Sequence, residues 1–202
     1  MAGDRRTTVG RPREFETDEA LERAMRVFWA QGYDGTNLTD LTTAMGITRT
    51  SLYAAFGNKE ALFRKALQRY SAGPGSYGSW ALQEPTAREV AAAFLRGGVE
   101  TTTRPDRPAG CLSVQGALAV APQNRPVADA VSDWRDDARA RLTERFALAR
   151  DEGDLPASSD PALLARYLMV VSTGMAVQAA GGAGREELHR VVDAALAAWP
   201  PA

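Results

Sequence analysis

The sequence predicts an all-α fold with an N-terminal helix-turn-helix domain followed by a larger helical domain. Apolar residues recur at helical spacing through most of the 202 residues, and no segment shows the alternation typical of a β-strand. Glycines and N-capping residues separate the helical segments at short intervals. The composition, 45% hydrophobic and 24% charged, is that of a globular protein and excludes a disordered chain.

Four helices are expected in the first 70 residues. The first follows Thr17 and ends at Gly32. Its apolar face, at the spacing of one side of a helix, consists of Leu21, Ala24, Met25, Phe28 and Trp29. The next three are expected over about 37–45, 49–56 and 59–70, with N-caps at Thr36 or Asn37, at Thr48 and at Asn58.

The rest of the chain is predicted to form a second helical domain. Its helices are expected at about 87–102, from near Cys111, over about 127–153, over about 161–180, and over the segment from Leu188 to Trp199. The predicted organisation is therefore a basic flexible arm over 1–13, a helix-turn-helix domain over 14–70 and a second helical domain over 86–200. A linker rich in Gly, Ser and Pro, 71–85, joins the two domains.

Charge is distributed unevenly along the chain. The formal net charge is −1, so any attraction to nucleic acid must be local. Residues 1–70 hold 11 basic and 9 acidic groups, and the first 13 residues carry four arginines against Asp4 alone. Such an arm can neutralise phosphates or reach into a minor groove, or it can be a solvated tail, and the sequence leaves both interpretations open.

Cysteine usage and hydropathy predict a cytoplasmic protein without a membrane partner. The single cysteine cannot form an internal disulfide, and the charged N-terminus has no apolar signal core. Residues 167–184 form an uncharged run, but they include Ser172, Thr173 and Gln178. A helix buried on all sides in a core, or in a dimer interface, explains this run better than a membrane span.

Residues 36–63 have the layout of a helix-turn-helix, whose second helix fits the major groove of DNA. Gly46 supplies the corner, and Leu41, Met45, Ile47 and Leu52 hold the helices together. The predicted DNA-binding residues are Thr36, Asn37, Thr39, Thr48, Arg49, Thr50, Ser51, Tyr53 and Lys59. Arginine can read guanine, whereas Tyr53 and Lys59 are expected to contact phosphates. An ordinary helical corner with a polar outside is the alternative interpretation.

This segment resembles the DNA-binding domain of the tetracycline-repressor (TetR) family of transcriptional regulators. The matching residues are Gly32-Tyr33, Thr36, Leu41, Met45-Gly46-Ile47, Ser51-Leu52-Tyr53, Phe56 and Asn58 to Phe63. Thr42 departs from the alanine usual at the helix crossing, and Ala55 stands where histidine is common. The resemblance implies that residues 14–70 are a DNA-binding domain and that residues 86–200 are a regulatory and dimerisation domain. It further implies a homodimer formed through the last two helices, a palindromic double-stranded DNA operator, and a small-molecule effector bound inside the regulatory domain.

The effector pocket is predicted only loosely, because large residues on the regulatory helices could equally be plain core. The candidate ligand-binding residues are Trp80, Phe94, Cys111, Trp134, Tyr167, Met169, Met175 and Gln178. A mainly apolar or aromatic small molecule is expected, and no cofactor is implied.

Cys111 has two interpretations. It can be a small, inert, buried hydrophobe, or a sensor thiol near a helix N-terminus after Arg104 and Arg107. Gly110-Cys111-Leu112 resembles the same region in a subset of the family that includes electrophile- and oxidant-sensing repressors. Without a second cysteine, the thiol could form only an adduct, a sulfenic acid or an intersubunit disulfide.

No catalytic or metal-binding constellation is visible in the sequence, so an enzyme is not expected. His189 and Cys111 lie far apart in the sequence, and they match neither a nucleophilic triad nor a zinc site. Two other function classes stay open as alternatives: a helical enzyme, which substrate turnover would reveal, and an adaptor whose helix-turn-helix contacts protein rather than DNA.

Overall fold

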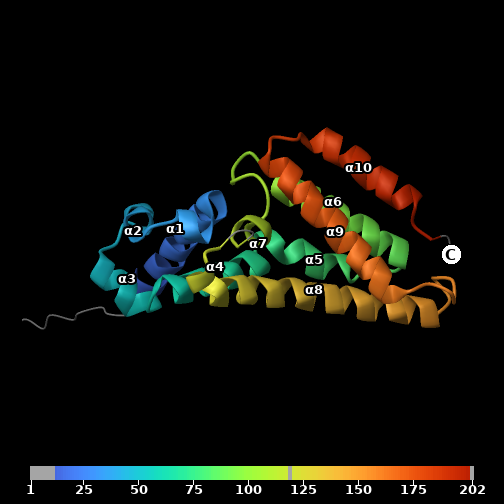
Figure 1. Cartoon of the computed structure of the whole chain (residues 1–202), viewed down its shortest axis with the longest axis horizontal. Coiled ribbons are helices and arrows are strands. Elements are labelled where there is room, and N and C mark those ends of the chain that lie inside the picture. Colours follow the sequence, from blue (N-terminus) through green and yellow to red (C-terminus); the bar gives the residue numbers. More distant parts are fainter. Residues whose placement is uncertain (1–11, 118–119, 201–202) are drawn as a thin grey trace, which may run out of the picture.

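The structure, a computed structural model, describes residues 12–117 and 120–200 as an elongated assembly of helices (Figure 1). The helices are α1 (Pro12–Gly35), α2 (Leu38–Met45), α3 (Arg49–Phe56), α4 (Lys59–Ala72), α5 (Tyr77–Ala81), α6 (Ala87–Thr102), α7 (Leu112–Gln115), α8 (Arg125–Asp151), α9 (Pro161–Ala180) and α10 (Arg185–Ala197). Short 3-10 turns, η1 (Pro74–Ser76) and η2 (Pro122–Asn124), precede α5 and α8. No strand occurs in this part of the chain, and the predicted all-α fold is confirmed.

Side-chain caps define the helix-turn-helix as the sequence predicts. Asn37 caps α2 in a capping box with Asp40, and the Thr48 hydroxyl accepts the Ser51 N–H at 3.1 Å at the start of α3. Gly46 ends α2 in the left-handed conformation, with φ at 70°, which glycine adopts without steric cost. The corner between α2 and α3 is therefore encoded locally.

The N-terminal helix begins earlier than the sequence pattern suggests. Helix α1 starts at Pro12, a residue suited to a first helical position, so Thr17 lies inside the helix rather than before it. Residues 12 and 13, assigned above to the flexible arm, belong to this helix, and residues 1–11 lie outside the described residues. Gly32, with φ at 71°, breaks α1 as predicted, but a last helical turn continues to Gly35.

The predicted linker over 71–85 is wrong in part, because η1 and α5 form there. The cause is a tertiary contact with α6. A Cβ atom at Gly97 would lie 2.8 Å from the Tyr77 Cβ, so only glycine lets α5 approach this closely. Tyr77 also packs on Phe94, with ring centroids 5.8 Å apart. Packing thus orders a segment whose composition is typical of a loop.

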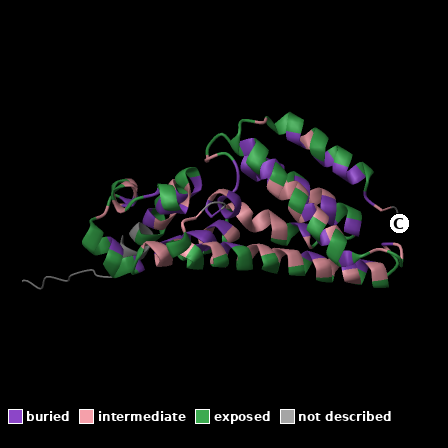
Figure 2. Cartoon of the chain, in the orientation of Figure 1, coloured by how far each residue is buried: buried purple, intermediate pink, exposed green. Residues whose placement is uncertain are grey.

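Two hydrophobic cores organise the described residues. Figure 2 shows the buried residues along the helices. The first is built from α1–α4, and it also takes in residues from α7 and the start of α8, such as Leu112 and Val131. The second joins α6, α8, α9 and α10. Helix α8 runs along much of the molecule and contributes to both (Figure 1). Helices α7 and α8 therefore pack directly into the core beneath the helix-turn-helix.

Helix α9 is not buried on all sides. The prediction that its apolar sequence reflects complete burial in a core is therefore wrong. By length and composition it could cross a membrane, and 28% of its most apolar window is buried. Leu163 and Val170 are 64% and 65% exposed, and Val177 is 43% exposed. Their seven-residue spacing places all three on one stripe of the helix. That a dimer interface covers this stripe stays a prediction.

Candidate nucleic-acid interface and ligand cavity

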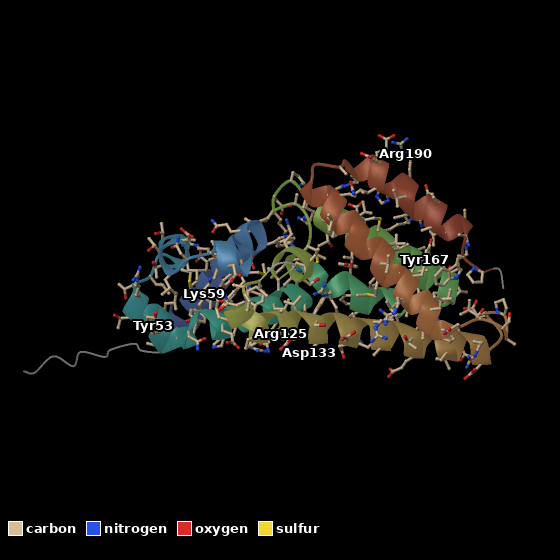
Figure 3. The ribbon with its side chains drawn as sticks, in the orientation of Figure 1. Tyr53, Lys59, Arg125, Asp133, Tyr167 and Arg190 are labelled. Atoms are coloured by element: carbon tan, nitrogen blue, oxygen red, sulfur yellow. The ribbon has the colours of Figure 1, made fainter. Side chains whose placement is uncertain are left out.

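The polar residues of the helix-turn-helix form an exposed face at one end of the molecule. Seven of the predicted DNA contacts are exposed: Asn37, Thr39, Thr48, Arg49, Thr50, Ser51 and Tyr53. Tyr53 and Lys59 lie at this end, away from Tyr167 on α9 (Figure 3). Leu52 and Phe56 are buried on the opposite side of α3, and they hold its polar face outward. Direct contact of these side chains with DNA stays a prediction.

Arg49 is held in place before any DNA is bound. Its guanidinium donates a hydrogen bond to the Thr39 hydroxyl at 3.0 Å, from α3 across to α2. Since an arginine side chain has five N–H donors, this contact leaves others free for a base edge. The two helices therefore position Arg49 jointly.

Thr36 is a correction to the predicted contacts. Its side chain is 2% exposed, and its hydroxyl donates to the Gly32 carbonyl at 2.7 Å. This hydrogen bond joins the kink in α1 to the start of α2. The hydroxyl therefore has a structural role and is not available to DNA in this conformation.

Lys59 is placed by an aromatic ring. Its ammonium group lies 4.1 Å from the centroid of the Tyr33 ring, an attractive cation–π arrangement. Partial burial lowers the pKa of Lys59, while attraction to Asp34 and Asp40 acts in the opposite direction. The Tyr33 ring thus fixes the position of the half-buried Lys59 side chain, which lies at the N-terminus of α4.

A cavity of about 290 Å³ lies between the two cores. Its walls come from the end of α4, from η1 and α5, and from α6, α7, α8 and α9. The lining combines aromatic and apolar groups with several hydroxyls and a few charges: Ser71, Gly75, Tyr77, Gly78, Ser79, Leu82, Phe94, Thr102, Cys111, Ser113, Val114, Trp134, Arg135, Asp137, Ala138, Arg141, Met169, Ser172, Thr173 and Ala176. Such a mixture suits a small amphipathic molecule.

Half of the predicted pocket residues line this cavity: Phe94, Cys111, Trp134 and Met169. The other four do not, which corrects the prediction. Trp80 is 73% exposed on α5, and Gln178 is exposed on α9. Met175 is buried in the second core, and the Tyr167 hydroxyl donates to the Ala195 carbonyl of α10 at 3.5 Å.

The sequence did not predict four of the cavity residues, Tyr77, Ser113, Ser172 and Thr173. The sequence pattern of a helix does not show whether a single serine or threonine faces a cavity. Tyr77 stands in a segment whose composition is typical of a loop. The described residues contain no group of three or more His, Cys, Asp or Glu side chains that could hold a metal ion. The chemistry available in the cavity is therefore hydrogen bonding, apolar contact, ionic contact with Arg135, Asp137 and Arg141, and the reactivity of one thiol.

Two hydroxyls flank that thiol. The Cys111 Sγ lies 3.1 Å from the Tyr70 hydroxyl and 3.0 Å from the Ser113 hydroxyl. Burial raises the pKa of Tyr70 well above its ordinary value, so its hydroxyl stays protonated near neutral pH. Arg104, expected to act on the thiol, instead donates two hydrogen bonds to Asp106 at 2.8 and 2.9 Å.

Comparisons with known proteins match both parts of the chain. Residues 20–66 match the model of bacterial regulatory proteins of the tetR family, and residues 89–197 match that of the tetracyclin repressor-like C-terminal domain. The HTH-type transcriptional repressor ComR of Escherichia coli K12 is 32% identical over 194 residues, covering 95% of this chain and 92% of ComR.

Two solved structures are similar over nearly the whole chain. A cysteine mutant of the TetR family transcriptional regulator CifR, in complex with 26-bp operator DNA, is 43% identical with a TM-score of 0.87, covering 97% of this chain and all of that one. A regulator from Rhodococcus sp. RHA1, described as a TetR transcriptional regulator, is 44% identical with a TM-score of 0.63, covering 91% of this chain and 98% of that one. The chain therefore belongs to the tetR family of bacterial regulatory proteins.

Proposed function

We propose that this chain is a cytoplasmic, non-enzymatic transcriptional repressor that binds a palindromic operator as a homodimer. The observation that carries this proposal is the exposed polar face of α3, held outward by the buried Leu52 and Phe56. The operator complex of CifR, whose fold this chain shares closely, supports the same mode of binding. Two recognition helices related by a two-fold axis would read half-sites about one helical turn apart, roughly 34–36 Å.

The cavity supports release of the operator by a small molecule. We infer a mainly apolar or aromatic effector, because Tyr77, Phe94, Trp134 and Met169 contribute to the walls. An effector must bind the conformation without DNA more tightly, and this coupling is typically about 1–3 kcal/mol.

Selection of bound duplexes from a random pool tests the central proposal. We expect a palindrome to be enriched, and its binding to weaken as salt is raised. An adaptor that contacts protein through the helix-turn-helix would enrich no sequence, and that outcome would remove the repressor proposal.

Replacing Arg49 by alanine is expected to weaken operator binding by about 1–3 kcal/mol and to relax base preference at one position. The reason is that the exposed guanidinium, steadied by Thr39, is suited to the O6 and N7 atoms of guanine. Quantitative binding to the operator and to its single-base variants measures both effects. Arg49→Lys is the matched control, since it keeps the charge and loses the bidentate geometry. Equal weakening on every sequence would assign Arg49 to a phosphate instead.

Removing residues 1–11 is expected to lower operator affinity and to flatten its salt dependence. The slope of log K against log salt changes by up to about 0.9 for each phosphate that the arm no longer neutralises. A variant with Arg5, Arg6 and Arg11 changed to glutamine separates the loss of charge from the loss of chain. Identical slopes for the truncated and full chains would show that the arm takes no part in binding.

A thiol switch is a second candidate for the signal, because Cys111 lines the cavity and has two hydroxyls beside its sulfur. Treatment with N-ethylmaleimide is expected to release the operator from the wild-type protein and not from Cys111→Ser. Mass spectrometry can count the adduct directly, since the chain has one cysteine. Alkylated protein that keeps full operator affinity would leave a non-covalent effector as the signal.

A further inference from the structure

Tyr70 lies where the ligand cavity meets the core of the DNA-binding domain. It belongs to α4, and it is completely buried. Its hydroxyl hydrogen-bonds with the Cys111 Sγ at 3.1 Å, and Cys111 forms part of the cavity wall. Its ring belongs to the first core, together with α1, α2 and α3. One side chain therefore touches the cavity wall with its polar end and the DNA-binding domain with its ring.

The ring of Tyr70 is packed against tryptophans from two other helices. Trp29 of α1 meets it edge to face, with centroids 4.9 Å apart at an interplanar angle of 90°. Trp134 of α8 lies on another side, at 6.4 Å and 62°. Trp134 also lines the cavity, and its indole N–H donates to the hydroxyl of Ser71, the neighbour of Tyr70 on α4. Trp134 therefore joins this part of the cavity wall both to the Tyr70 ring and to helix α4.

Trp29 connects this group to the segment that carries Cys111. Its indole N–H donates to the Gly110 carbonyl at 3.1 Å, and Gly110 directly precedes Cys111. Trp29 and Tyr70 are both completely buried, so a shift of the Tyr70 ring away from the cavity presses on Trp29 or on α4. Both elements belong to the core that supports the recognition helix.

We propose that Tyr70 is the positioning residue through which an occupant of the cavity changes the placement of the DNA-binding helices. This inference rests on the proposed repressor function and specifies how its signal travels. Through the contact between the Tyr70 hydroxyl and the Cys111 sulfur, a change at the cavity wall reaches the DNA-binding domain. An occupant that separates these atoms leaves the buried Tyr70 hydroxyl without a hydrogen-bond partner, which raises the free energy of this conformation. A changed arrangement of α4 and α1 lowers that free energy again.

A double-mutant cycle on operator affinity tests the proposal without a known effector. Cys111→Leu imitates an occupant, because it adds apolar bulk at the cavity wall and removes the partner of the Tyr70 hydroxyl. We expect it to lower affinity for the selected palindrome by about tenfold. In a Tyr70→Phe background, where no hydroxyl is left unpaired, the same substitution should cost about threefold or less.

Tyr77→Phe is the matched control. Tyr77 lines the same cavity and also loses one hydroxyl, but it packs with Phe94 against the second core. In this background Cys111→Leu should still cost about tenfold. Circular dichroism and thermal unfolding verify that each variant is folded, and Cys111→Val, which also removes the sulfur, replaces Cys111→Leu if leucine prevents folding.

Equal losses in the Tyr70→Phe and Tyr77→Phe backgrounds would overturn the proposal. A folded Cys111→Leu protein with wild-type affinity would also overturn it, because the cavity wall would then not be coupled to DNA through Tyr70. Absence of any selected sequence for the wild-type chain is a different result, which removes the repressor function itself.

Discussion

Replacing Val170 by glutamate is expected to convert the dimer to monomers and to lower operator affinity by roughly 100-fold. Val170 is 65% exposed at the middle of the α9 stripe formed with Leu163 and Val177. In a two-fold interface the same patch faces its copy, so the substitution places one carboxylate from each protomer in the interface. Removing these two charges from water is energetically unfavourable. Each monomer then binds DNA through a single recognition helix, and the binding free energy from the second half-site is lost.

Sedimentation and operator titration measure the two effects separately. Since the valine side chain is exposed, the folded monomer should keep its helix content. Leu148→Glu is the matched control, because Leu148 is also an exposed aliphatic residue, 51% exposed, on α8. A Val170→Glu protein that stays dimeric with wild-type affinity would place the dimer interface elsewhere.

Replacing Phe63 by alanine is expected to destabilise the protein by about 3–5 kcal/mol. Phe63 of α4 is completely buried, and its ring meets Phe28 edge to face at 5.1 Å and Tyr33 at 5.4 Å. A Cβ placed on Gly116 would lie 3.0 Å from the tip of the Phe63 ring, so Phe63 also packs against the segment after α7. The alanine variant would leave a cavity where the two parts of the protein join.

Chemical denaturation gives the free energy of unfolding, and Phe63→Leu is the matched control. Leucine fills part of the space without aromatic contacts, so its cost should be clearly smaller. A loss below about 1 kcal/mol for Phe63→Ala would mean that the surrounding helices collapse into the space. In that case the contact between Phe63 and the segment after α7 would contribute little to the free energy of unfolding.

The helix-turn-helix could be predicted from the sequence because its determinants are close in the chain. Asn37, Thr48 and Asn58 cap their helices through bonds to backbone groups two or three residues away. Gly46 forms the corner through its own φ angle. The burial of Leu52 follows from the helical period of α3. The same local rules failed at Thr36, where a hydroxyl that suits a cap or a phosphate bonds the Gly32 carbonyl instead.

The cavity could not be predicted in the same way, because five stretches separated in the chain build its wall: 71–82, 94–102, 111–114, 134–141 and 169–176. An apolar residue on a regulatory helix can face a core, a cavity or solvent, and helical periodicity does not distinguish these surroundings. Trp80 thus lies exposed, whereas Tyr77, three residues earlier, lines the cavity because Gly97 admits α5 against α6. Local capping and spacing by themselves determined the all-α fold and the helix-turn-helix. Only tertiary packing decided which side chains line the cavity and that Tyr70 joins the cavity to the DNA-binding core, because both depend on contacts between residues far apart in the sequence.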